Sequence, residues 1–266
     1  MRVKIDASLS YHFAEAADVV LALEAIRASD QRVVFDQLTL SPACPLTLAD
    51  GPELMGRRQW TTASGEVTIR YEAIVDVTRG HVNIAGLYVP RRRDLPHEVI
   101  TYLMPSRYCE SDRLAPFAES QFASGAQGGN QVLEMADWIY ENFEYAPGTS
   151  DATTTATDSF LMRRGVCRDF AHTLISFCRA VGIPARMVSA YAPGITPPDF
   201  HAVVEVWLDN AWHLIDPTRL SAEDSLVRIA VGRDATDISF MTIFGAATLV
   251  GQSVAVSVVA PDAVPT

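Results

Sequence analysis

The sequence predicts an α+β protein, in which a β-rich first part precedes a second part of helices packed on an antiparallel sheet. Three observations support this class. Residues 67–75 combine β-branched and aromatic side chains with near alternation, which is typical of a half-buried strand. Apolar residues recur every three or four positions over residues 167–181, as in an amphipathic helix. Two apolar runs flank Asp209 and Asn210, a pair that favours a hairpin turn.

The first part, residues 1–115, is predicted to be a β-sandwich-like domain. Its expected strands cover residues 3–9, 32–38, 59–62, 67–77 and 82–88. Residues 14–27 are ambiguous, because their Ala, Leu and Glu content favours a helix while alternating apolar residues permit a strand. No cluster of chemically active side chains stands out here, so we expect this part to serve packing or to border a substrate groove.

The second part, residues 116–266, carries the helices, the hairpin and a C-terminal strand. A glycine-rich join leads into a helix predicted over residues 131–143. After the helix of residues 167–181, Gly182 supplies a left-handed cap and Pro184 prevents the helix from resuming. The remaining expected strands cover residues 199–207, 212–216 and 252–260.

Cys167 lies in the first turn of the predicted helix, where a buried face meets the helix start. That turn has unpaired N–H groups and a partial positive charge, and both favour a thiolate over a thiol. Since the thiolate is the nucleophile, Cys167 is a candidate for covalent catalysis. Free cysteines are more often small core residues, and we predict that role for Cys178 and no reactivity for Cys44 or Cys109.

His201 and Asp216 are the two further residues that such chemistry requires. They belong to the two predicted strands of the hairpin, and a turn at Asp209 and Asn210 would place them nearly opposite each other. A cysteine, a histidine and an acid that orients the histidine form a catalytic triad in its cysteine form. His172 lies about 140° around the helix from Cys167 and is therefore a poor base; we expect it to bond a neighbouring loop instead.

Four motifs in this order resemble the transglutaminase-like superfamily, and more narrowly its bacterial cysteine peptidases with an N-terminal β domain. They are Gly-Val-Cys-Arg-Asp-Phe-Ala-His from residue 165, Cys-Arg-Ala-Val-Gly-Ile-Pro-Ala-Arg from 178, Asp-Phe-His-Ala-Val-Val-Glu-Val-Trp from 199 and Trp-His-Leu-Ile-Asp-Pro-Thr from 212. The resemblance implies a papain-like core and a triad of Cys167, His201 and Asp216. It also favours a strand for residues 14–27.

This resemblance implies cysteine-dependent acyl transfer on peptide or protein amides through a thioester, and we favour hydrolysis. Two alternatives stay open: a protein-glutamine transglutaminase that uses an amine acceptor, and a non-catalytic peptide-binding scaffold. The chain has no tryptophan between residues 151 and 166 to serve as the oxyanion donor known in animal transglutaminases. We therefore expect the backbone N–H of Cys167 to fill that role, with a second donor near residues 153–155.

Composition restricts the possible partners and cofactors. A net charge of −11 argues against a nucleic-acid surface, and no apolar run is long enough to span a membrane. The first residues lack the apolar core of a signal peptide, and four unpaired cysteines suit a reducing environment, so we expect a cytoplasmic protein. We expect no cofactor and no metal, because Cys167, His172 and Cys178 do not share a helix face. The oligomeric state is left open.

Overall fold

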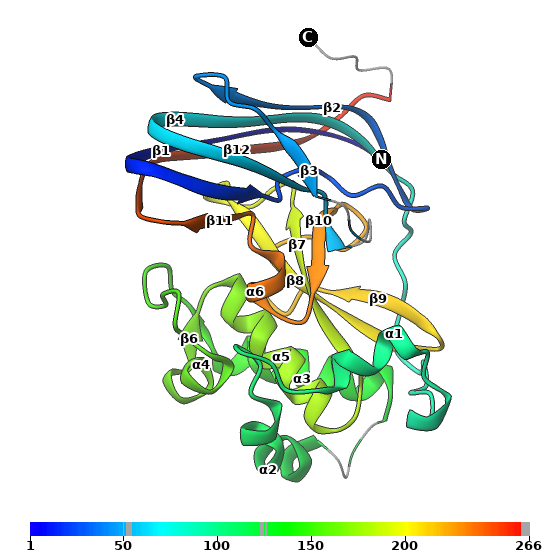
Figure 1. The fold of residues 1–266 in the computed structure, drawn as a ribbon. Helices are drawn as coiled ribbons and strands as arrows, with labels where there is room; N and C mark the ends of the chain where they lie inside the picture. Colours follow the sequence, from blue (N-terminus) through cyan, green and yellow to red (C-terminus); the bar gives the residue numbers. More distant parts are fainter. Residues whose placement is uncertain (50, 52–54, 123–124, 126, 262–266) are drawn as a thin grey trace.

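The computed structural model describes residues 1–49, 51, 55–122, 125 and 127–261, and the statements below concern these residues. Figure 1 shows a large sheet at one end of the molecule, a second sheet in the middle and most helices at the other end. Both sheets are antiparallel, and the helices are concentrated on one side of the second sheet. The predicted α+β class is therefore confirmed.

The first sheet has six strands, built around two long ones that pair along almost their whole length. It has the order β11-β1-β4-β2, while β12 also pairs with β1 and β3 with β4. The strands are β1 (Arg2–Leu21), β2 (Gln31–Ser41), β3 (Thr47–Ala49), β4 (Arg58–Val77), β11 (Met241–Phe244) and β12 (Ala247–Val259). The pairing of β1 with β4 shifts register between Phe13 and Ala17. The ambiguous residues 14–27 thus continue β1 as a strand as far as Leu21.

The second sheet has the order β10-β7-β8-β9, and its strands are buried on both faces except the edge strand β9, which is partly exposed. Its strands are β7 (Ala185–Tyr191), β8 (Phe200–Leu208), β9 (Ala211–Ile215) and β10 (Val227–Gly232). One face packs against the helices through residues such as Met187 and Val204. Tyr191, Val227 and Ile229 instead join the apolar core of the first sheet, so the two sheets are packed together.

Most helices lie below the second sheet in Figure 1, with α5 in contact with β7 and β8, while α6 lies beside the sheet against β10. They are α1 (His97–Ile100), α2 (Ser111–Phe122), α3 (Gly129–Asn142), α4 (Ala156–Met162), α5 (Cys167–Ala180) and α6 (Ala235–Ile238). Two short 3-10 turns, η2 (Arg92–Asp94) and η3 (Thr101–Leu103), lie in the connection that precedes α2. A parallel pair, β5 (Glu144–Tyr145) with β6 (Arg164–Gly165), precedes α5.

The prediction of a strand over residues 82–88 was wrong. This segment has no regular pairing and runs as a connector, with Leu87 packed against the helical core. The Leu87 carbonyl instead meets the start of α3, where it accepts a hydrogen bond from the Gly129 N–H at 2.8 Å. A Cβ at Gly129 would lie 1.7 Å from the Ile84 oxygen, so this close approach requires glycine.

The predicted division of the chain at residue 115 stays a prediction, but the structure adds two facts to it. Residue 115 lies inside α2 (Ser111–Phe122), which packs on α5. The C-terminal strands β11 and β12 both pair with β1, so the last part of the chain completes the first sheet. The strands of the predicted sandwich-like part belong to this single sheet.

Candidate active site

Cys167 is the first residue of α5, and the turn before it is fixed by hydrogen bonding. The Asp169 carboxylate is fully buried and accepts a hydrogen bond from the Val166 N–H at 2.8 Å. This is the carboxylate half of a capping box, which satisfies a donor that the helix start leaves free. A Cβ at Gly165 would lie 2.5 Å from the Asp169 Cβ, so only glycine fits there. The turn leaves Cys167 partly exposed.

The apolar stripe predicted for α5 is buried as expected, but the opposite, polar face is buried too. Asp169, His172 and Ser176 are fully covered, and Arg179 is 4% exposed. Arg179 explains how this is possible, because it donates to the carbonyl groups of Ala185, Met104 and Arg233 and to the Ser106 hydroxyl. Segments from before α2 and after β10 therefore cover a helix face that its sequence makes polar.

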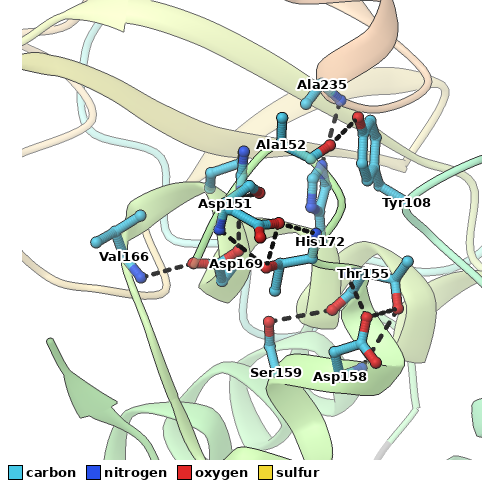
Figure 2. Close-up of polar contacts among 12 residues, drawn as sticks. Tyr108, Asp151, Ala152, Thr155, Asp158, Ser159, Val166, Asp169, His172 and Ala235 are labelled. Atoms are coloured by element: carbon cyan, nitrogen blue, oxygen red, sulfur yellow. Dashed lines mark hydrogen bonds and ion pairs between the residues drawn. The ribbon is translucent and has the colours of Figure 1, made fainter. Parts of the chain in front are cut away.

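His172 holds one of these covering segments and does not serve Cys167. Its Nε2 accepts a hydrogen bond from the Ala235 N–H at 3.2 Å, and its ring stacks on Tyr108 at 5.2 Å between centroids. Tyr108 in turn donates to the Ala152 carbonyl, as Figure 2 shows. Burial lowers the pKa of His172 to about 3, so the ring is neutral at physiological pH. His172 therefore bonds a neighbouring segment instead of Cys167, and its partner is the first residue of α6 and not a loop as expected.

The hairpin brings His201 and Asp216 together as the sequence predicts. Asp209 and Asn210 both have positive φ angles, 53° and 61°, which is the geometry of a type I′ turn. The β8 to β9 register pairs Val204 with Ile215, which places Asp216 near the His201 end of β8. His201 Nε2 lies 2.8 Å from Asp216 Oδ2, and both residues are buried.

Asp216 is held as a carboxylate by further donors. Its Oδ1 accepts hydrogen bonds from the Thr218 N–H and hydroxyl, at 2.9 and 2.6 Å, and its Oδ2 accepts from the Ser221 N–H. Burial alone would raise the pKa of Asp216, but the bonds from His201 and Thr218 keep it below its ordinary value of 3.8. The carboxylate is thus ionised and fixed in position behind the imidazole.

The Cys167 side chain lies close enough to His201 to affect its pKa. Burial alone would lower the pKa of His201, but the hydrogen bond to Asp216 and then the interaction with the Cys167 side chain raise it to about 9. Because Asp216 occupies Nε2, Nδ1 is the ring nitrogen left for the sulfur. The structure therefore brings together all three residues that the sequence singled out, on α5, β8 and the end of β9.

The other cysteines differ from Cys167 in their surroundings. Cys109 and Cys178 are fully buried, and burial raises the pKa of both thiols to about 12. Cys44 is partly exposed, and its thiol donates to the Pro42 carbonyl at 3.4 Å. Within the part of the chain that the structure describes, none of these three cysteines is among the groups that affect the pKa of His201 or Asp216.

The expected second oxyanion donor near residues 153–155 is not supported. The hydroxyl groups of Thr153 and Thr154 already donate to Asp151, and that of Thr155 donates to Asp158 (Figure 2). These bonds build the turn before α4 and its capping box, in which Thr155 is the N-cap and Asp158 its partner. The residue that sequence reasoning missed is Tyr145, which pairs with Gly165 and has its pKa affected by Cys167.

Comparisons with known proteins agree with this geometry. Residues 116–217 match the family described as the transglutaminase-like superfamily. A proposed cysteine protease from Cytophaga hutchinsonii is 33% identical, and its crystal structure aligns over 100% of this chain and 93% of its own, with a TM-score of 0.92. The chain belongs to the transglutaminase-like superfamily. This membership indicates cysteine-based catalysis in general.

Two curated relatives match over parts of their length. An uncharacterised protein of Mycobacterium leprae is 30% identical over 146 residues, which cover 52% of this chain and 52% of that protein. The chain thus spans about half the length of this relative. The protein-glutamine gamma-glutamyltransferase of Pseudomonas aeruginosa is 34% identical over 92 residues, which cover 30% of this chain and 14% of that protein. Among the helices described here, none is both long and apolar enough to cross a bilayer.

Proposed function

We propose that this protein is a cysteine-dependent amide hydrolase that acts on peptides or proteins through a thioester intermediate. The observation that carries the proposal is the convergence of a helix start that presents Cys167 with a hairpin whose His201 bonds Asp216 at 2.8 Å and has its pKa raised further by the Cys167 side chain. A nucleophile next to a base that a third group orients is the arrangement used for covalent acyl transfer.

The proposed reaction has two halves. The Cys167 sulfur attacks the amide carbon, and the carbonyl electron pair moves to the oxygen to give a tetrahedral oxyanion. The oxyanion collapses, the C–N bond breaks, and the leaving amine takes its proton from the His201 imidazolium. Water then attacks the thioester while its proton passes to His201, and the second collapse releases the acid and restores the thiolate and imidazolium.

Asp216 acts in this scheme by orienting the ring and stabilising its charged form. Its Thr218 and Ser221 donors hold the carboxylate in place, so the proton on Nε2 stays directed at Oδ2. Nδ1 is then the nitrogen that exchanges a proton with the sulfur, the leaving amine and water. Because Asp216 makes and breaks no bond to the substrate, its loss should cost less activity than the loss of Cys167.

The acceptor decides between hydrolysis and transamidation. The Cytophaga hutchinsonii protein, which aligns over nearly the whole chain, is described as a proposed protease, and this supports water as the acceptor. The Pseudomonas aeruginosa relative is named a glutamyltransferase, and it supports an amine acceptor over a much smaller part of the chain. We therefore favour hydrolysis.

The first test is selective alkylation of Cys167. At pH 6 an ordinary cysteine with a pKa of about 8.5 is almost entirely thiol, so a thiolate paired with imidazolium should react with iodoacetamide at least about tenfold faster. Peptide mapping by mass spectrometry should place the label on Cys167 and show its loss in Cys167→Ala. Cys178→Ala is the matched control and should leave labelling at Cys167 unchanged. Reaction of Cys167 no faster than a free thiol would favour the non-catalytic scaffold.

The second test separates the two acceptors. A peptide library incubated with the protein should yield new N-termini, and these products should be absent with Cys167→Ala. A parallel reaction with a primary amine should incorporate little of it into glutamine side chains. Release of ammonia with amine incorporation, and without new N-termini, would assign transamidation instead.

A further inference from the structure

Tyr145 is fixed beside the nucleophile by main-chain pairing. Strand β5 (Glu144–Tyr145) runs parallel to β6 (Arg164–Gly165), and the register pairs Tyr145 with Gly165. The Ala146 N–H donates to the Gly165 carbonyl at 2.9 Å, and the Glu144 N–H donates to the Arg163 carbonyl at 2.9 Å. Since Gly165 precedes Cys167 by two residues, this pairing sets the main chain of Tyr145 against the turn that carries the sulfur.

The side chain of Tyr145 is directed at Cys167. Its ring packs on Phe170, one turn along α5, with centroids 5.8 Å apart. Its hydroxyl lies close enough to Cys167 that both the backbone N–H and the thiol of that residue affect the pKa of Tyr145. Burial, followed by the interaction with Cys167, raises the pKa of Tyr145 well above its ordinary value of 10, so the hydroxyl keeps its proton at neutral pH. The residue is nevertheless 40% exposed, so a substrate can reach it.

We propose that the Tyr145 hydroxyl donates a hydrogen bond to the oxyanion formed during acyl transfer, together with the backbone N–H of Cys167. This inference rests on the proposed function. The carbonyl carbon bonds to the sulfur, so its oxygen develops charge close to the Cys167 N–H. The Tyr145 hydroxyl lies near both groups, because its main chain pairs with Gly165 and its ring packs on Phe170. A donor there stabilises charge present in the transition state and absent from the thiolate alone.

A simple acyl donor isolates this step without knowledge of the natural substrate. With 4-nitrophenyl acetate, the Cys167 sulfur bonds to the acetyl carbon and the carbonyl electron pair moves to oxygen. Collapse of the tetrahedral intermediate then breaks the bond to the leaving oxygen and releases 4-nitrophenolate. The acetyl group stays on the sulfur as acetyl-Cys167. Alkylation of the same sulfur by iodoacetamide displaces iodide in one step and forms no oxyanion. The ratio of the two rates therefore reports oxyanion stabilisation separately from thiol reactivity.

The experiment compares Tyr145→Phe with the wild type. The variant keeps the ring on Phe170 and removes only the hydroxyl, and we expect acetylation of Cys167 to slow by about 10²-fold. Alkylation of Cys167 at the same pH should stay within about threefold, which also shows that the site is formed. The matched control is Tyr140→Phe, because Tyr140 lies on α3 with its ring against Arg219, and both rates should be unchanged.

Two outcomes would overturn the inference, and they are distinguishable. If the rates of acetylation and alkylation of Cys167 changed by the same factor in Tyr145→Phe, the hydroxyl would only hold the thiol. The proposed function would then stand, but Tyr145 would not be an oxyanion donor. A wild-type protein that gives no acetyl-Cys167 and no burst of 4-nitrophenolate would overturn the proposed function, and this inference with it.

Discussion

Replacement of Asp216 by Asn should remove the charge that keeps His201 protonated. The carboxylate accepts a hydrogen bond from His201 Nε2 at 2.8 Å. This bond is the strongest of the interactions that raise the pKa of the His201 ring to about 9. An amide keeps the shape but carries no charge, and it can donate to Nε2, which would move the ring proton to Nδ1. The pKa of His201 should then fall towards its ordinary value of 6.5 or below, because burial continues to lower it.

The size of the effect follows from the two pKa values. At pH 7.5 a ring with a pKa of about 9 is ~97% protonated, whereas one with a pKa of 6.5 is ~9% protonated. The population of imidazolium able to protonate a leaving group therefore falls about tenfold. The fall in pKa from about 9 to 6.5 corresponds to about 3 kcal/mol in the relative free energy of the two protonation states. NMR titration of histidine labelled with ¹³C should show this directly, with the His201 signal assigned through His201→Gln.

Asp137→Asn is the matched control for this titration. Asp137 pairs with Arg219 at the surface, with 54% of its side chain exposed, and its replacement should leave the His201 midpoint near 9. The reasoning would be refuted if the Asp216→Asn midpoint stayed within about half a pH unit of the wild type. If Cys167 in the Asp216→Asn variant were acetylated at pH 7.5 as fast as in the wild type, the orienting role of Asp216 would be excluded separately.

Two predictions on stability accompany this one. His172 has a pKa lowered from 6.5 to about 3 in the folded state, so it contributes stability that is present above pH 6.5 and lost as the pH falls towards 3. At pH 4.5 this loss amounts to about 3 kcal/mol, and urea unfolding at several pH values should show a flatter dependence for His172→Gln than for the exposed control His12→Gln. Gly165→Ala should displace Asp169, because the added Cβ would lie 2.5 Å from the Asp169 Cβ, and should lower the free energy of unfolding by about 1–3 kcal/mol. Gly80→Ala, with nothing within 4 Å, should change it little, and equal losses in the two variants would contradict the reasoning.

The sequence alone predicted the parts of the site that depend on local spacing. The three-and-four pattern of α5 placed Cys167 at a helix start, and the Asp209 and Asn210 turn set a register that brings His201 and Asp216 together. Each inference concerns one element or one tight turn, where covalent geometry limits the possible arrangements. Such features are recognisable in a single chain because few conformations satisfy them.

The tertiary structure decided what covers these elements. Nothing in the spacing of α5 shows that Arg179 and His172 would be buried, since their partners at Met104, Arg233 and Ala235 come from distant segments. Tyr145 reaches Cys167 only because β5 pairs with β6 across a long intervening loop and helix. Residues 82–88 are apolar enough for a strand, yet the Leu87 carbonyl bonds Gly129 at the start of α3 and the Tyr88 carbonyl bonds Asp209 in the hairpin turn. Contacts of this kind depend on which segments pack together, and that choice is made by the burial of the whole chain.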